Sequence, residues 1–239
     1  MRGPGVTDMT RHTHYRRWGK RALDITLSAS AIIVLSPLLV LIAVVVRLFL
    51  GSPVLFRQRR SGMQQRTFTI LKFRTMTDAR DERGELRSDS DRLTRLGRWL
   101  RLTSLDELPE LFNVLKGEMS LVGPRPLMPQ YDPHYRNDEI ARFDVLPGIT
   151  GWAQVNGRNG LSWEQRFALD CWYVDRVSFW LDVRILLRTI GTVLRRDNVY
   201  VDTSVAFLSL DVERRLAAAG EEASASAAVC DVASQEACR

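Results

Sequence analysis

Residues 103–111 read Thr103-Ser104-Leu105-Asp106-Glu107-Leu108-Pro109-Glu110-Leu111, and they mark the expected start of a helix. Ser104 stands three residues before Glu107, which is the spacing of a capping box. An apolar face with helical period then follows, made of Leu108, Leu111, Phe112 and Leu115. We therefore expect Asp106 in the first turn of this helix, just after a basic run of Arg95, Arg98 and Arg101.

The adjacent carboxylates of Asp106 and Glu107 have two interpretations. Acidic side chains near a helix N-terminus complement the helix dipole, so a purely structural role would explain them. Alternatively, one carboxylate attacks a phosphorus centre while its neighbour holds a divalent metal, a division of labour open to Asp and Glu at neutral pH. The pair by itself does not choose between these interpretations, so the rest of the sequence must.

Length and composition limit the range of functions. A chain of 239 residues can hold one catalytic domain with a membrane element and a tail. Its 34 Lys and Arg against 28 Asp and Glu give a net charge of +6, which favours anionic partners such as phosphates, anionic lipid or nucleic acid. Cys171, Cys230 and Cys238 have no neighbour at metal-ligand spacing, which argues against a disulfide framework and a zinc site.

An uncharged run of 22 residues, Ile25 to Val46, is long enough to cross a bilayer core of about 30 Å at about 1.5 Å per residue. Pro37 lies near its middle and removes a backbone donor, while the Ser36 hydroxyl can satisfy the carbonyl that this leaves free. The break at Ser36-Pro37 would leave two arms that each reach about half of the core. A re-entrant hairpin fits this pattern, and a kinked single-pass helix is the alternative.

Charge flanks the apolar run on both sides, with Arg16, Arg17, Lys20 and Arg21 before it and Arg47, Arg57, Arg59 and Arg60 after it. The positive-inside tendency would then place both ends on the cytoplasmic face. We predict an α+β, mostly helical fold with a small β-hairpin and interfacial amphipathic helices. The expected organisation is a disordered N-terminus (1–15), a re-entrant membrane helix (16–50), a cytosolic catalytic domain (51–210) and a disordered Ala/Ser-rich tail (211–239).

Local patterns predict several elements of the domain. Segments 54–56 and 67–73 read as short strands joined by a turn at residues 59–62, and 78–91 reads as an exposed charged loop. Leu93, Leu96, Trp99 and Leu100 alternate with arginines, which is typical of a helix at a membrane interface or of an ordinary surface helix. Segments 163–177 and 180–194 are further helix candidates, in which we expect the aromatic residues mainly to pack.

Two later segments suit anion and ligand binding. In Pro124-Arg125-Pro126 an arginine between two prolines has little backbone freedom, so its guanidinium can be aimed at an anion at a reduced entropy cost, although Pro-Arg-Pro also occurs in linkers. In Pro147 to Arg158, glycine turns alternate with amide side chains, which suits a loop around a polar ligand; turn chemistry alone would also explain the glycines.

Taken together, six motifs in this order and spacing resemble the bacterial sugar transferase family, the monotopic phosphoglycosyl transferases that begin lipid-linked glycan assembly. The resemblance covers about residues 16 to 200. Its motifs are Lys20-Arg21-Ala22-Leu23-Asp24, the Ser36-Pro37 break, Lys72-Phe73-Arg74-Thr75-Met76, Ser104-Leu105-Asp106-Glu107-Leu108-Pro109, Gly123-Pro124-Arg125-Pro126 and the Gly151-to-Arg158 loop. Many larger relatives carry further transmembrane helices before this region, so we expect the minimal catalytic form here.

The resemblance implies transfer of a phosphosugar from a nucleotide diphosphate sugar, a UDP-hexose by preference, to polyprenyl (undecaprenyl) phosphate, with UMP released. It implies Asp106 as the nucleophile that forms a covalent phosphosugar intermediate, and Glu107 as a ligand of Mg²⁺. Metal and guanidinium groups would neutralise the donor's negative charge, which otherwise repels an attacking carboxylate. The candidates for substrate contacts are Lys72, Arg74, Arg101, Arg125, Gln154, Asn156 and Arg158.

The resemblance places such an enzyme on the cytoplasmic face of the bacterial inner membrane, in contact with membrane lipid. We expect no nucleic-acid partner, because the apolar run is long and no nucleic-acid motif is recognisable. We allow for a homodimer. The competing hypothesis is a membrane-tethered protein that binds nucleotide or anionic lipid without turnover, in which the basic groups bind phosphate and the carboxylates cap a helix.

Overall fold

The structure, a computed structural model, describes residues 14–157, 160–195, 210 and 212–215. The helices are α2 (Lys20–Phe49), α3 (Asp89–Arg92), α4 (Arg95–Leu102), α5 (Glu110–Lys116), α6 (Trp152–Asn156), α7 (Trp163–Asp175) and α8 (Phe179–Arg195). The strands are β1 (Leu55–Ser61), β2 (Thr67–Phe73), β3 (Ser120–Val122) and β4 (Gly148–Thr150). A mostly helical fold with small sheets is confirmed, whereas residues 1–13 and most of the predicted tail lie outside the described residues. Tyr15, which was predicted to be disordered, instead begins a π-helical turn, Tyr15–Gly19, and its hydroxyl donates to Asp182 at 2.6 Å.

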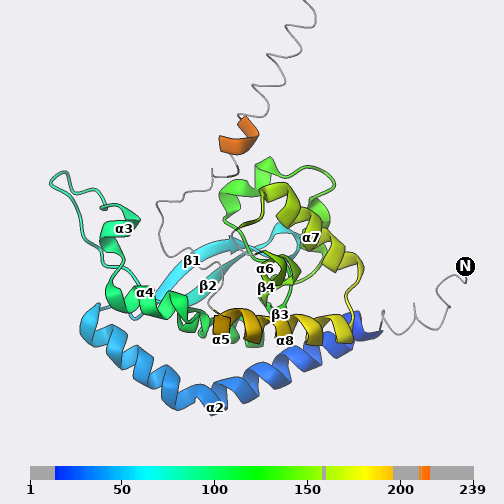
Figure 1. The fold of residues 1–239 in the computed structure, drawn as a ribbon, viewed down its shortest axis with the longest axis horizontal. Helices are drawn as coiled ribbons and strands as arrows, with labels where there is room; N and C mark the ends of the chain where they lie inside the picture. The colour runs from blue at the N-terminus through cyan, green and yellow to red at the C-terminus, as the bar shows by residue number, and fades with distance from the viewer. Residues whose placement is uncertain (1–13, 158–159, 196–209, 211, 216–239) are drawn as a thin grey trace, which may run out of the picture.

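The long helix α2 runs along one side of the molecule, and α4, α5 and α8 lie next to it (Figure 1). The two small sheets lie on the other side of these helices. β1 and β2 form an antiparallel hairpin, and β3 pairs with β4 in parallel, with Ser120 opposite Gly148 and Val122 opposite Thr150. The fold therefore has a membrane-type helix at one face and a compact α+β domain above it.

Within the described residues, the stretch Tyr15–Phe49 is the one helix long and apolar enough to cross a membrane, and only 11% of its most apolar window is buried. The predicted break at Pro37 is not seen, because α2 continues through it as a bent helix (Figure 1). The predicted role of Ser36 is confirmed: its hydroxyl donates to the Ile33 carbonyl at 2.8 Å, the group that Pro37 leaves without a donor. A re-entrant hairpin is not confirmed by this geometry.

Polar contacts anchor the N-terminal turns of α2 to the domain. Lys20 is buried and its Nζ lies 2.7 Å from Oδ2 of Asp182 on α8. Arg21 donates to the carbonyls of Val114 and Leu115 in the last turn of α5, at 2.6 and 2.9 Å. The Asp24 carboxylate accepts from the Leu121 amide at 3.0 Å. Lys20 and Arg21 of the basic flank, together with Asp24, therefore attach the start of α2 to the domain.

The C-terminal part of α2 is held by apolar packing instead. Ile42, Val46 and Leu50 form a core with Phe73 of β2 and Leu100 of α4. Between Ser28 and Ile42, α2 has no buried residue. Both ends of the helix are thus fixed to the same domain, while its middle is exposed.

The β-hairpin is longer than the sequence predicts. β1 pairs with β2 from Leu55 opposite Phe73 to Ser61 opposite Thr67, so most of the predicted turn at residues 59–62 belongs to the strand. The chain reverses instead at a 3₁₀ turn, Met63–Gln65, where Gln64 and Gln65 have positive φ angles of 53° and 58°. The long hairpin brings Lys72 opposite Phe56 on one face.

One buried amide joins β2 to α5. Asn113 is fully buried; its Oδ1 accepts from the Leu71 amide at 3.1 Å and its Nδ2 donates to the Thr69 carbonyl at 2.7 Å. The side chain therefore pairs with the edge of β2 that β1 does not cover, as a neighbouring strand would. This contact fixes the distance between β2 and the start of α5, where the acidic residues lie.

The two predicted C-terminal helices are confirmed as α7 and α8. α7 begins with a capping box in which Ser162 and Gln165 bond each other's backbone amides. Beyond α8, Leu210 is fully buried beside Trp163 and Phe167, and Arg214 pairs with Glu139. The contacts of the domain therefore extend past the predicted boundary at residue 210.

α4 packs against the chain after β2 through a glycine. Thr94 caps the helix by accepting from the Gly97 amide at 2.9 Å. A Cβ atom at Gly97 would lie 1.9 Å from the Thr75 carbonyl oxygen, which is closer than any real contact. Only glycine lets α4 approach this backbone, and the approach sets the place of Arg101 one turn further along the helix.

We predict that Gly97→Ala destabilises the protein by about 1–3 kcal/mol, because α4 must move away from Thr75. Gly191→Ala on α8 is the matched control: its Cβ would have no neighbour within 4 Å, so stability should stay equal or rise by up to about 1 kcal/mol. Thermal unfolding of the detergent-solubilised full chain measures both. Equal melting temperatures for the two variants would contradict the close approach.

Candidate active site

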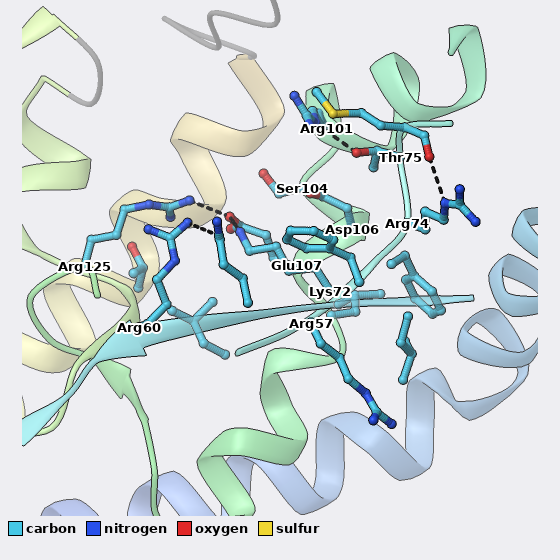
Figure 2. A pocket seen from close by; sticks show the side chains of 18 of the residues that line it. Arg57, Arg60, Lys72, Arg74, Thr75, Arg101, Ser104, Asp106, Glu107 and Arg125 are labelled. Atoms are coloured by element: carbon cyan, nitrogen blue, oxygen red, sulfur yellow. Dashed lines mark hydrogen bonds and ion pairs between the residues drawn. The ribbon is translucent and has the colours of Figure 1, made fainter. Parts of the chain in front are cut away.

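An open cleft of about 1510 Å³ lies beside the β-hairpin and α4 and reaches α6 and α8. It brings together seven of the nine substrate and catalytic residues predicted from the sequence, which are Lys72, Arg74, Arg101, Asp106, Glu107, Arg125 and Gln154. Figure 2 shows Asp106 and Glu107 at its centre, Arg125 and Arg60 on one side, and Arg101, Thr75 and Arg74 on the other. Residues that are far apart in the chain thus converge on the acidic pair.

The acidic pair lies in a 3₁₀ turn, Leu105–Glu107, rather than in the first turn of α5. The predicted capping box is wrong: Ser104 is in the left-handed region at φ 55°, its side chain makes no capping hydrogen bond, and α5 begins only at Glu110, after Pro109. A left-handed serine is strained, and such strain is typical of functional sites. The extra turn places Asp106 in the cleft with 8% of its surface exposed.

Two cations meet on one oxygen of Glu107. Its Oε1 accepts from Lys72 Nζ at 2.6 Å and from Arg125 Nη2 at 2.8 Å. Lys72 also lies 3.1 Å from Oε1 of Glu110, which is 1% exposed. This cluster joins β2, the 3₁₀ turn, the start of α5 and the Pro124-Arg125-Pro126 segment in one buried ionic network.

The electrostatics differ between the three carboxylates. Burial opposes the ionisation of Glu107, but Lys72 and Arg125 outweigh it and hold its pKa well below the usual range. Burial, with the charge of Glu107, raises the pKa of Glu110 to about 7. Burial and Glu107 likewise raise the pKa of Asp106, against the opposing effect of Lys72 and Arg101. Glu107 is therefore the fixed anion of the site, whereas the pKa values of Asp106 and Glu110 are both raised.

The described residues form no hydrogen bond with the Asp106 carboxylate, although Lys72, Arg101 and Arg125 all influence its pKa. Arg101 reaches this region from α4, and its Nε donates to Thr75 Oγ1 at 3.1 Å. Its two terminal nitrogens have no hydrogen bond among the described residues. The arrangement leaves a buried carboxylate between guanidinium groups that can receive an anion.

The other predicted residues differ in their surroundings. Arg74 is 8% exposed, and it donates to the Ser52 and Met76 carbonyls at 2.9 Å each and pairs with Asp78. It thus holds loops together at the edge of the cleft. Gln154 lines the cleft, donates to the Ile149 carbonyl at 3.0 Å, and has a buried Oε1 without a hydrogen-bond partner among the described residues.

Two predicted residues do not join the site. Asn156 is exposed and lies outside the cleft lining; its amide bonds the Trp152 carbonyl and Arg188. We therefore do not propose it as a substrate contact. Arg158 lies outside the described residues.

Sequence reasoning missed Arg60 as a residue of the cleft and used it only as a flanking charge. Its guanidinium donates to Gln58 and to the Pro126 carbonyl, and burial together with the neighbouring Arg125 lowers its pKa to about 10. Two guanidinium groups at such close quarters favour an anion between them. Alternation along the β-strand, which places Arg60 on the same face as Gln58 and opposite Phe68, is the signal that could have found it.

A second missed feature is a buried ion pair behind Arg125. Arg142 Nη2 lies 2.9 Å from Oδ2 of Asp170, and both side chains are 2% exposed. The same nitrogen donates to the Arg125 carbonyl at 2.8 Å, and Nη1 donates to the Tyr135 hydroxyl. This pair supports the Pro124-Arg125-Pro126 segment from behind and so contributes to the aim of the Arg125 guanidinium.

The donor set of the site fits a magnesium ion that is shared with a substrate. The described residues hold no group of three His, Cys, Asp or Glu side chains placed to bind a metal alone. Mg²⁺ is commonly held by one or two carboxylates together with substrate phosphates and water. Both cations bond Oε1 of Glu107, and Oε2 makes no hydrogen bond within the described part of the chain.

A family model described as bacterial sugar transferase matches residues 15–196. This range includes Asp106, Glu107 and the basic residues that surround them in the cleft. The chain belongs to the bacterial sugar transferase family. One relative is the uncharacterized sugar transferase EpsL of Bacillus subtilis. It is 51% identical to this chain over 180 residues, which cover 75% of this chain and 89% of the relative.

Two further relatives in this family carry functional names. The undecaprenyl-phosphate glucose phosphotransferase of Komagataeibacter xylinus is 47% identical over 196 residues, which make up 76% of this chain but 37% of that protein. The UDP-glucose:undecaprenyl-phosphate glucose-1-phosphate transferase of Caulobacter vibrioides is 44% identical over 192 residues, covering 76% of this chain and 72% of the relative.

We predict that Arg142→Met lowers the free energy of unfolding by about 3–5 kcal/mol, because it removes the ion-pair and hydrogen-bond partner of the buried Asp170 carboxylate. The double variant Arg142→Met/Asp170→Leu should recover most of this loss, since an apolar pair leaves no buried charge. Denaturant unfolding of the three proteins measures the effect. A double variant less stable than Arg142→Met would contradict the view that the buried Asp170 charge causes the loss.

Proposed function

We propose that this bacterial sugar transferase moves a phosphosugar from a UDP-sugar to undecaprenyl phosphate through a covalent intermediate on Asp106. The observation that carries the proposal is a buried Asp106 carboxylate, without a hydrogen bond among the described residues, beside a Glu107 fixed by Lys72 and Arg125. A non-catalytic phosphate-binding site has no need to bury a second carboxylate there, because that carboxylate repels the ligand.

In the first step, an Asp106 carboxylate oxygen attacks the phosphorus that carries the sugar. A bond forms between this oxygen and phosphorus, the bond from that phosphorus to the bridging oxygen of the diphosphate breaks, and UMP leaves with the bridging oxygen. Arg101 and Arg125, which lie on opposite sides of Asp106 in Figure 2, are placed to neutralise the phosphate oxygens. The raised pKa makes Asp106 a stronger nucleophile than an ordinary carboxylate.

In the second step, a phosphate oxygen of undecaprenyl phosphate attacks the same phosphorus. The bond to Asp106 breaks, the carboxylate is regenerated, and undecaprenyl diphosphate sugar is released. Two displacements at one phosphorus allow one set of cations to serve both steps. The fixed charge of Glu107 keeps Lys72 and Arg125 in place while substrates exchange.

Mg²⁺ is the proposed cofactor, with Glu107 as its protein ligand. When bound, it would supply further neutralisation of the diphosphate charge. A lysine and two arginines already surround the acidic pair, so the ion adds to a field that the chain itself provides. The donor is proposed as a UDP-hexose, because the named relatives are glucose phosphotransferases.

The membrane arrangement is proposed as monotopic, on the cytoplasmic face of the inner membrane. Both ends of α2 contact one domain, which cannot lie on both sides of a bilayer, and the exposed middle of the helix is bent with its concave side towards the domain (Figure 1). We propose that α2 dips into one leaflet and returns. On α4, the buried Leu100 and the half-exposed Trp99 suit a helix at the interface.

We predict that Asp106→Asn abolishes UMP release from UDP-glucose or UDP-galactose by the purified full chain with Mg²⁺, because an amide cannot act as the nucleophile. The matched control is Asp138→Asn, an exposed residue outside the cleft, which should keep wild-type turnover. Coupled detection of UMP measures both. Normal UMP release by Asp106→Asn would exclude this nucleophile and return the site to the non-catalytic alternative.

We predict that tags at both termini are accessible only from the cytoplasm, because both ends of α2 are fixed to the same domain. Protease treatment of spheroplasts should leave an N-terminal tag intact, and treatment of inverted vesicles should remove it. A periplasmic N-terminal tag would exclude the re-entrant arrangement and favour the kinked single-pass helix.

A further inference from the structure

Two residues near the C-terminus pack into the domain. Leu210 is fully buried, and the Arg214 side chain is 13% exposed. Both follow residue 196, where the match to the family model ends. In Figure 1 this part of the chain, drawn in orange, lies on the side of the domain away from α2. We call Leu210 and Arg214 the C-terminal clasp, and neither residue belongs to the described lining of the cleft.

Leu210 completes an apolar cluster on the Arg125 side of the cleft. Its neighbours in this cluster include Leu127, two residues after Arg125, and Trp163 and Phe167 on α7. Leu127 also lines the cleft. Because protein interiors are close-packed, a fully buried leucine at this place sets the spacing between α7 and the segment that carries Arg125.

Arg214 joins neighbouring parts of the chain through its charge. Its Nη2 lies 2.5 Å from Oε1 of Glu139, which is 6% exposed and directly precedes the 3₁₀ turn Ile140–Asp144. Its Nη1 lies 3.8 Å from Oε1 of Glu164 in the first turn of α7. Glu164 is 60% exposed and also pairs with Arg136, so this second contact is the weaker one. The guanidinium thus connects the 3₁₀ turn to α7.

The clasp lies at the junction that supports Arg125. Within the turn Ile140–Asp144, Arg142 donates to the Arg125 carbonyl at 2.8 Å and pairs with Asp170 of α7. The pair Arg142–Asp170 therefore connects the turn to α7, and Arg214 connects the same two elements a second time. A shift of about 1 Å in a group that positions a substrate can cost much of its effect, so the packing behind such a group matters.

We propose, on the basis of the function proposed above, that Leu210 and Arg214 are positioning residues for the nucleotide sugar. They keep α7 and the Pro124-Arg125-Pro126 segment together, so that the Arg125 guanidinium meets the phosphate groups of the donor. They act through the protein, without contact to the substrate. Arg101, on the other side of Asp106, belongs to α4 and does not depend on the clasp.

The test compares the affinities for the two substrates. We expect Leu210→Ala and Arg214→Ala each to raise the KM for the UDP-sugar about fivefold and to leave the KM for undecaprenyl phosphate within about twofold of wild type. Both variants should also melt at a lower temperature, because a buried contact is lost. Initial rates of UMP release by the purified full chain give both constants, and equilibrium binding of UDP gives donor affinity without turnover.

Conservative variants and neighbouring residues provide the controls. Leu210→Met and Arg214→Lys keep the volume and the charge, so they should recover most of the donor affinity. Val212→Ala and Arg215→Ala change an apolar and a basic residue of the same segment, where Val212 is 37% exposed and Arg215 is exposed. Neither should change the KM values or the affinity for UDP.

Clasp variants with a lower melting temperature but an unchanged KM for the UDP-sugar and unchanged UDP affinity would overturn the proposal, because the clasp would then only stabilise the domain. An equal rise in the KM for undecaprenyl phosphate would also overturn it. If the wild-type protein binds UDP but releases no UMP, the proposed function fails, and the clasp is then decided by UDP affinity alone. A wild-type protein that neither binds UDP nor releases UMP would overturn both.

Discussion

The site depends on one buried carboxylate held by two cations. Glu107 accepts from Lys72 of β2 and from Arg125 of the segment after β3 through a single oxygen. Such a cluster is stable only when every member stays in place, because a buried charge that loses its partner is costly. The rest of the domain supplies this order: Asn113 ties β2 to α5, and Arg142 supports the Arg125 backbone.

The same cluster explains why two neighbouring carboxylates can do different work. Glu107 keeps its charge because the cations are closest to it, whereas Asp106 keeps a more basic carboxylate without a fixed partner among the described residues. The left-handed Ser104 and the following 3₁₀ turn direct the side chains of Asp106 and Glu107 into the cleft, so that they do not lie at a helix N-terminus. α2 and α4 then hold this cleft at the side of the molecule where apolar residues are exposed.

The sequence predicted the parts of this account that rest on local pattern or on ordered motifs. Local chemistry predicted the hydrogen bond of the Ser36 hydroxyl, the strands of the hairpin and the helices of residues 163–177 and 180–194. The resemblance to the family predicted the site residues Lys72, Asp106, Glu107 and Arg125. The capping box failed because Pro109 delays the start of α5, although Ser162 and Gln165 form one at the same spacing. Arg142 and Asp170 are 28 residues apart and lie in no shared pattern, so only the fold could bring them together.

The measurement that most directly tests the account is intact-protein mass spectrometry of the full chain after brief mixing with UDP-sugar in the absence of lipid acceptor. The account expects a mass increase of one phosphosugar, localised by fragmentation to Asp106, that disappears when undecaprenyl phosphate is added. Continued turnover with no such adduct, or an adduct on another side chain, would contradict it.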